Sequence, residues 1–165
     1  MAETKIYLSS ALDANLREAA MKRFGFGKGS ISNAASEAIT QWLAREDLIK
    51  STLEAIISIA KQDKNAVAVI LFGSYARKEP NYRDIDVAIL LRQKSGSAAL
   101  EPYSKRVSRL FDLSILNGLP DELQSRIFEE GTVIYSKDNA LLHDLSMKAA
   151  RSWSDFRWLM GSSPR

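Results

Sequence analysis

Two short apolar runs separated by a polar turn constrain the fold of this chain more than any other feature. The first run, Val67 to Leu71, is followed almost at once by the pair Gly73 and Ser74. An apolar, β-branched run of this length that ends at a Gly-Ser pair indicates a buried strand leading into a tight turn. The second run, Ile85 to Leu91, is slightly longer and again mostly apolar. The segment therefore predicts two buried strands connected by a polar loop.

Two carboxylates, Asp84 and Asp86, stand at the start of the second run. Residues two apart on a strand point to the same side, so we expect both carboxylates to emerge on one face. Like charges this close repel, and each raises the cost of ionising the other. A divalent cation offsets that repulsion, and Mg²⁺ is commonly held by one or two carboxylates together with substrate phosphates. The pair therefore predicts a magnesium site.

The turn at Gly73 and Ser74 adds a second element to this site. It supplies backbone N–H groups and a hydroxyl, and such donors at a strand-to-helix turn suit phosphate. Metal-binding acids opposite phosphate-binding donors predict a site for a nucleoside triphosphate. Asp-x-Asp alone is a weak signal that usually marks a solvated strand end. Gly-Ser after a buried strand, followed after a nine-residue spacer by Asp-hydrophobic-Asp-hydrophobic, is much more specific.

The segment LFGSYARKEPNYRDIDVAILL resembles the signature of the DNA polymerase β-type nucleotidyltransferase superfamily. Its sequence Gly-Ser-Tyr-Ala-Arg is most similar to that of the minimal nucleotidyltransferases (MNT), which are often encoded beside HEPN partners. The resemblance implies an α+β fold in which residues 48–165 form a small nucleotidyltransferase domain with a mixed sheet and helices. It also implies Mg²⁺ as cofactor and ATP or another nucleoside triphosphate as substrate. Two departures are a spacer one residue shorter than is common and Lys78 in place of a glycine.

By the same resemblance, Asp84 and Asp86 are catalytic and metal-binding, and the nucleotide-binding residues are Gly73, Ser74, Arg77 and Lys78. The family uses a third carboxylate on a later strand, and Asp112 interrupts the apolar run from Leu110 to Leu116. A charge within a buried strand is costly unless it is paired or bound to a metal. We therefore expect Asp112 to be the third catalytic and metal-binding acid. The alternative is a strand-end aspartate capped by backbone N–H groups.

Residues 1–47 follow the pattern of a separate unit: a strand over 4–9, a helix, a glycine-rich turn and a second helix starting near Ser30. Such a unit is too small to be stable alone. The pattern resembles a ribbon-helix-helix domain, in which two chains pair their strands and share one core. The resemblance implies a homodimer through residues 1–47. It also implies a DNA-binding ribbon, with contacts from Lys5, Tyr7 and Ser9 on the strand and Lys28 before the second helix.

Charge leaves the DNA-binding role of this unit open. Residues 1–48 carry six Lys or Arg and six Asp or Glu, whereas DNA-binding modules usually have a basic excess. The alternative is therefore a dimerisation unit that never contacts DNA.

Composition excludes several classes of function. The chain has no cysteine, so it has neither a disulfide framework nor thiol chemistry, and its single histidine, His143, cannot build a zinc site. No secretory signal or apolar run of about 20 residues occurs, so we expect a cytoplasmic protein without a membrane partner.

Together these features favour an MNT-type antitoxin that transfers AMP from ATP to a hydroxyl of a HEPN-type toxin. A different class of function is a DNA-binding autoregulatory antitoxin, which acts by sequestration and only binds nucleotide in its core. Operator DNA would then be a partner. Nucleotidylation of a small molecule is a third alternative.

Overall fold

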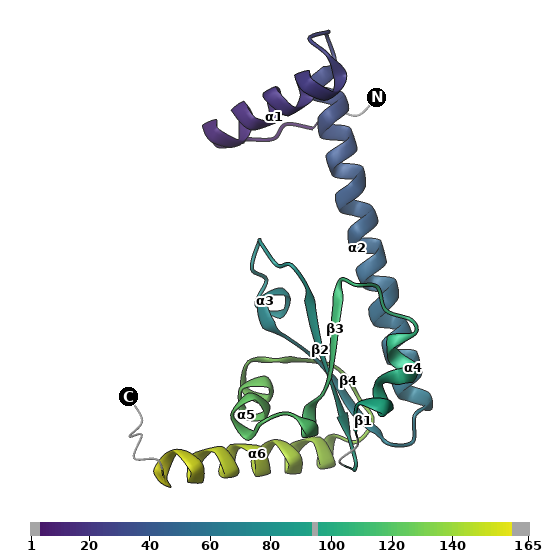
Figure 1. Ribbon diagram of the computed structural model, residues 1–165, viewed down its shortest axis with the longest axis vertical. Helices are drawn as coiled ribbons and strands as arrows, with labels where there is room; N and C mark the ends of the chain where they lie inside the picture. Colours follow the sequence, from purple (N-terminus) through teal and green to yellow (C-terminus); the bar gives the residue numbers. More distant parts are fainter. Residues whose placement is uncertain (1–3, 94–95, 160–165) are drawn as a thin grey trace. The chain divides into compact units, whose positions relative to one another are not determined.

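The computed structural model describes residues 4–93 and 96–159 and divides the chain into two compact units, Met1–Lys50 and Ser51–Arg165. Its elements are helices and a single sheet, coloured along the chain in Figure 1. This α+β architecture is the fold class that the resemblance to nucleotidyltransferases implied.

The first unit contains helix α1 (Ser10–Phe24) and the beginning of helix α2 (Ser30–Gln62). The Ser9 hydroxyl caps α1 by accepting a hydrogen bond from the Leu12 N–H at 3.3 Å. At the other end, Gly25 takes φ +79° and its N–H bonds to the carbonyl of Met21, which ends the helix as glycine commonly does. The turn is closed by Ser30, whose hydroxyl donates to the carbonyls of Gly25 and Gly27.

The predicted N-terminal strand is absent from the described residues of the single chain: residues 4–9 are assigned to no strand. The side chains of Ile6 and Leu8 in this segment are 57% and 39% exposed. A ribbon needs a second strand to supply its hydrogen bonds, and one copy of this segment has none. The second helix does begin at Ser30, but it continues without interruption to Gln62.

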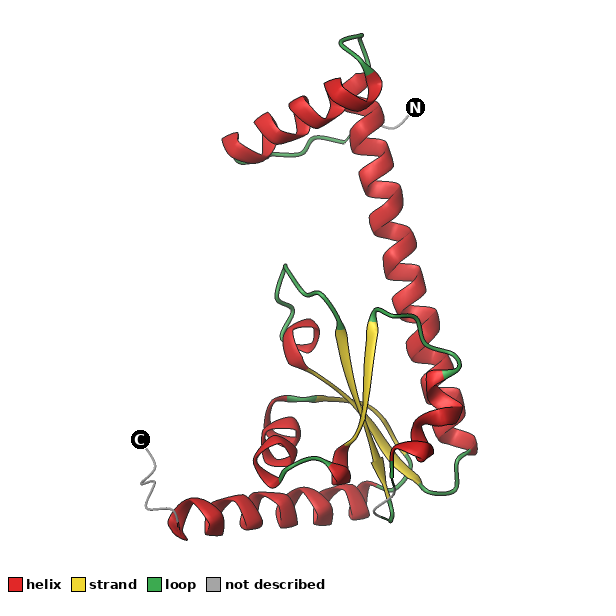
Figure 2. Ribbon diagram, in the orientation of Figure 1, coloured by secondary structure: helices red, strands yellow, loops and turns green. Residues whose placement is uncertain are grey.

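The second unit is built on a four-stranded mixed sheet of order β3-β2-β1-β4 (Figure 2). The strands are β1 (Ala66–Phe72), β2 (Ile85–Leu91), β3 (Phe111–Ile115) and β4 (Thr132–Ser136). Strand β1 pairs antiparallel with β2 and β4, whereas β2 and β3 are parallel. The central strands β1 and β2 are almost wholly apolar and buried, as the two runs in the sequence predicted.

Helices α5 (Asp121–Glu130) and α6 (Asn139–Leu159) cover one face of this sheet. Their side chains, including Ile127, Leu142 and Leu145, pack on Ala68, Ile70, Ala88 and Leu90 of the central strands. Between α5 and β4 the chain passes so close to β1 that a Cβ on Gly131 would lie 2.6 Å from Cγ2 of Ile70 and 3.1 Å from the carbonyl oxygen of Leu71. It would also lie 2.4 Å from the carbonyl oxygen of Ile127 in α5. The close packing of α5 brings its side chains to the end of β1, where the site lies.

Short elements complete this unit. They are helix α3 (Gly73–Ala76) after β1, helix α4 (Glu101–Ser104) preceded by the 3₁₀ turn Ser97–Leu100, and the 3₁₀ turn Leu116–Gly118 after β3. The fully buried Tyr103 of α4 donates its hydroxyl to Asp63, just beyond the end of α2, at 3.0 Å. Burial first, and then the charge of Asp63, raise the pKa of Tyr103, so this phenol stays protonated and keeps its hydrogen bond. Among the described helices, none combines the length and the apolar character needed to cross a bilayer.

Candidate functional site

The turn after β1 is built around Gly73, which begins α3 with φ +71°. A Cβ on this residue would lie 2.0 Å from Oδ2 of Asp86, a distance no real Cβ contact has. Glycine is therefore required at this position for two reasons: the backbone is left-handed, and the carboxylate approaches closely. The Gly-Ser pair of the motif and its second aspartate are thus in direct contact.

The three predicted acids come together at one end of the sheet. Asp86 is the second residue of β2 and lies opposite Asp112 of β3 in the parallel register, while Asp84 immediately precedes β2. Burial raises the pKa of Asp86, the negative charges of Asp84 and then Asp112 raise it further, and Arg77 acts in the opposite direction. The carboxylates therefore repel one another, as the sequence predicted, and a bound cation would relieve that repulsion.

The three acids offer the type of ligand that magnesium prefers, but they do not lie close enough together to form a complete metal site. Carboxylate oxygens are the ligands that Mg²⁺ prefers in proteins. However, no three acids, histidines or cysteines are clustered tightly enough to hold a metal ion in the part of the chain that the structure describes. The expectation that Asp112 lies within a buried strand is also wrong: β3 is an edge strand and Asp112 is exposed. Water at the sheet edge removes the burial cost from which we had inferred its role.

A cavity of about 310 Å³ lies beside Asp86. Four predicted site residues line it, namely Gly73, Ser74, Arg77 and Asp86, together with Phe72 and three residues of α5, Leu123, Arg126 and Glu130. Its wall thus combines a carboxylate from the sheet, a hydroxyl from α3, a guanidinium group from the residue that follows α3, and a guanidinium group and a second carboxylate from α5. This composition suits an anion that also carries a cation, which is the character of a metal–nucleotide complex.

Sequence reasoning missed Arg126 and Glu130. The sequence signal that could have pointed to them is the spacing of Leu123, Arg126 and Glu130, which are three and four residues apart and therefore share one side of α5. In the structure these charges join Arg77 in a network. Arg77 bonds to Glu79 at 2.7 Å and approaches Glu130 to 3.6 Å, while Glu130 also accepts from Arg126 at 3.3 Å.

Lys78 lies elsewhere. It takes φ +59°, in the left-handed region that glycine adopts without cost and other residues adopt only with strain. Its side chain lines a different cavity, of about 370 Å³, beside the edge-to-face pair of Tyr75 and Tyr82. The structure therefore does not bring Lys78 together with the other predicted nucleotide-binding residues.

The four predicted DNA-contacting residues are all exposed in the first unit. The ammonium group of Lys5 lies over the ring of Tyr7, 5.1 Å from its centroid. The Ser9 hydroxyl accepts a hydrogen bond as the N-cap of α1, and its contact with DNA stays a prediction. Lys28 lies in the turn before α2.

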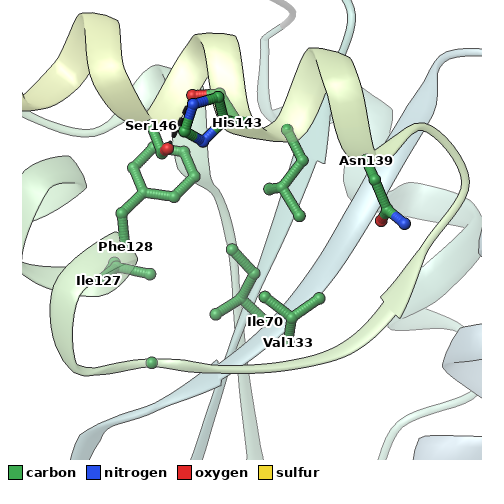
Figure 3. A pocket seen from close by; sticks show the side chains of 9 residues that line it. Ile70, Ile127, Phe128, Val133, Asn139, His143 and Ser146 are labelled. Carbon is green, nitrogen blue, oxygen red and sulfur yellow. Dashed lines mark hydrogen bonds between the residues drawn. The ribbon is translucent and has the colours of Figure 1, made fainter.

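Another cavity, of about 250 Å³, contains the single histidine and is shown in Figure 3. His143, Asn139 and Ser146 of α6 lie over a floor of apolar side chains that includes Ile70, Phe128 and Val133. The Ser146 hydroxyl bonds to the backbone carbonyl of His143 at 2.8 Å. None of the predicted site residues lines this cavity, so it is separate from the candidate site.

Comparisons with known proteins agree with this geometry. Residues 54–140, more than half of the chain, match the family model described as "Polymerase beta, Nucleotidyltransferase". No curated protein matches the chain.

Three solved structures share its fold. The first is described as a toxin-antitoxin with AMP-PNP and is 17% identical, with a TM-score of 0.54 over 71% of this chain and 93% of that one. A toxin-antitoxin described as MntA-HepT is 18% identical, with a TM-score of 0.54 over 68% and 93% of the two chains. A tri-AMPylated Shewanella oneidensis HEPN toxin in complex with MNT antitoxin is 17% identical, with a TM-score of 0.50 over 74% and 93%. With the family model covering most of the sheet and the motif, this chain belongs to the polymerase β nucleotidyltransferase family.

Proposed function

We propose that this protein is an MNT-type antitoxin that transfers AMP from ATP to a hydroxyl group of a HEPN-type toxin. The observation that carries the proposal is the cavity in which Gly73, Ser74 and Arg77 meet Asp86. Further support comes from the structural neighbours, one described with AMP-PNP and one as a complex of an MNT antitoxin with an AMPylated HEPN toxin.

In this proposal each side chain has a defined task. Gly73, Ser74 and Arg77 bind phosphate groups of ATP. Lys78 lines a separate cavity, and its contact with the same nucleotide would need its side chain to turn out of that cavity. Within the described residues the Ser74 hydroxyl has no hydrogen-bond partner, so it is free to donate to a phosphate oxygen. Asp84, Asp86 and Asp112 would hold Mg²⁺, which when bound neutralises charge on the triphosphate. The exposed Asp112 orients the incoming hydroxyl at the edge of the sheet.

The proposed reaction is a single displacement. The acceptor oxygen forms a bond to the α-phosphorus of ATP, the bond from that phosphorus to the bridging oxygen breaks, and pyrophosphate leaves with its electron pair. The acceptor proton passes to a carboxylate or to water. Atoms and charge balance without any further reactant.

Transfer is tested with ATP labelled at the α-phosphate, the purified protein and a HEPN-type protein as acceptor. We expect label on the acceptor that depends on magnesium, and we expect Asp86→Asn to abolish it while the variant keeps its melting temperature. An acceptor that stays unlabelled with the wild-type protein would refute the proposal. Loss of folding in Asp86→Asn would instead assign a structural role to this acid.

We further propose that a second copy of the chain covers the first unit. Among its described residues only Ala20, Ser30 and Ile49 are buried. Eleven large apolar side chains are exposed: Ile6, Tyr7, Leu8, Leu12, Met21, Phe24, Phe26, Ile39, Trp42, Leu43 and Leu48. A unit that buries so little has no core of its own, and pairing two copies would bury these side chains together. Trp42→Glu should convert the dimer to a monomer in light scattering, whereas a monomeric wild-type protein would contradict this assignment.

The same dimer would bring two copies of the segment around Lys5 and Tyr7 side by side, which suits a ribbon in the DNA major groove. We therefore propose operator DNA as an additional ligand, contacted by Lys5, Tyr7, Ser9 and Lys28. A gel shift with the promoter of the protein's own gene, weakened by salt and by Lys5→Ala, is the expected result. Equal affinity for the wild type and the variant would leave this unit as a dimerisation module only.

A further inference from the structure

Two charged residues that line the candidate cavity, Arg126 and Glu130, have no role in the proposed reaction. Arg77 reaches the cavity from the residue that follows α3 and Arg126 reaches it from α5, and the carboxylate of Glu130 lies between them. Oε2 of Glu130 is 3.6 Å from Nη1 of Arg77, and its Oε1 is 3.3 Å from Nε of Arg126. One acid thus contacts both arginines that line the same cavity.

These contacts are weak enough to be exchanged. The side chains of Arg77, Arg126 and Glu130 are 41%, 62% and 45% exposed, and ion pairs in water contribute little because solvent screens them. Neither distance is that of a short charge-assisted hydrogen bond. A phosphate group offers more negative charge and several oxygens, and arginine binds it with two parallel hydrogen bonds.

We infer that Glu130 is an internal counter-ion, which holds Arg77 and Arg126 until the phosphates of a nucleotide displace it, and that Arg126 is a further phosphate-binding residue. This inference rests on the proposed function, because it assumes that the cavity binds ATP. It adds a means of selection among nucleotides. A triphosphate can contact both arginines and so replace their contacts with Glu130, whereas a monophosphate has too little charge to contact both.

The test is binding of ATP and of AMP, measured by isothermal titration calorimetry. Glu130→Gln removes the competing charge and keeps the shape of the side chain. We expect the Kd for ATP to fall about threefold, the size of one exposed ion pair, with a smaller change for AMP. Arg126→Gln should raise the Kd for ATP by a similar or larger factor. In the double variant Arg126→Gln/Glu130→Gln, the gain from Glu130→Gln should shrink.

Glu129→Gln is the matched control, since Glu129 is an exposed neighbour on the same helix that does not line the cavity. It should leave the Kd for ATP unchanged. The inference is overturned if Glu130→Gln leaves ATP binding unaltered or weakens it. It is equally overturned if Glu129→Gln produces the same gain, or if the gain persists in full without Arg126. A wild-type protein that binds no ATP would remove the proposed function itself, and this inference with it.

Discussion

Replacement of Gly73 by alanine tests the central contact of the site. Two costs add in this variant. An L-residue held in the left-handed region loses about 1–2 kcal/mol relative to glycine, and Gly73 has φ +71°. The new Cβ would also lie 2.0 Å from Oδ2 and 2.9 Å from Cγ of Asp86. The carboxylate must therefore leave its position, and turning a side chain away from its rotamer costs about 0.5–1.5 kcal/mol.

The free energy of unfolding should consequently fall by about 2–3 kcal/mol, which corresponds to about 4–12 °C in melting temperature for a chain of this size. Nucleotidyl transfer should be lost more completely than stability, because Asp86 would be displaced from the acids proposed to hold Mg²⁺. Gly118→Ala is the control, since a Cβ there would make only ordinary contacts at 3.8 and 3.9 Å with Ile115.

A double-mutant cycle separates the two costs. In an Asp86→Ala background the nearest remaining atom of residue 86 would be its Cβ, at 3.4 Å, so the collision disappears and only the backbone strain is left. Gly73→Ala should then cost about 1–2 kcal/mol, measured by chemical denaturation in both backgrounds. An equal cost in the two backgrounds would refute the contact between Gly73 and Asp86 as the reason for this glycine.

Three further predictions concern single charges. Because the pKa of Asp86 is raised, the folded protein binds this proton more tightly than the unfolded chain does, and the free energy of unfolding falls as pH rises through the carboxyl range. The melting temperature of Asp86→Asn should therefore equal or exceed that of the wild type at neutral pH. This advantage should disappear in acid, where Asp86 of the wild type is protonated. Asp138 is the reverse case, since the Leu141 N–H and then Arg92 lower its pKa, so Asp138→Asn should destabilise the protein at neutral pH but not below the carboxyl range. Lys78→Gly should raise the free energy of unfolding by about 1 kcal/mol in denaturation experiments, because it relieves the left-handed backbone; a loss of stability would mean that the lysine side chain has contacts that outweigh the strain.

The parts of the fold that could be predicted are those fixed by neighbours in sequence. The strand Ile85–Leu91 and the turn at Gly73 follow from a run of apolar residues and a Gly-Ser pair, and the structure confirms both. The helix between Pro120 and Gly131 is similarly local, because proline favours a first turn and glycine an end.

The residues that could not be predicted depend on tertiary packing. Arg126 and Glu130 reach the cavity only because α5 docks against the end of β1, about 50 residues away in sequence, and periodicity reveals the face of a helix without its neighbour. The burial of Asp112 was misjudged for the same reason. Apolar neighbours indicate a strand, but they do not show whether that strand lies at the centre or the edge of a sheet.

The arrangement of charges explains why the acids and the arginines of the site can both remain available to a ligand. The arginines of the cavity are paired with Glu79 and Glu130, and within the described residues no ion pair joins them to Asp86. Asp84, Asp86 and Asp112 therefore keep their mutual repulsion at the end of the sheet, and they gain from a cation. Had Arg77 formed its ion pair with Asp86 instead, less of the negative charge of the acidic set would be left to attract a cation. Glutamates outside the acidic set thus keep the positive and negative halves of the site apart, which is the charge pattern that a metal–nucleotide complex requires.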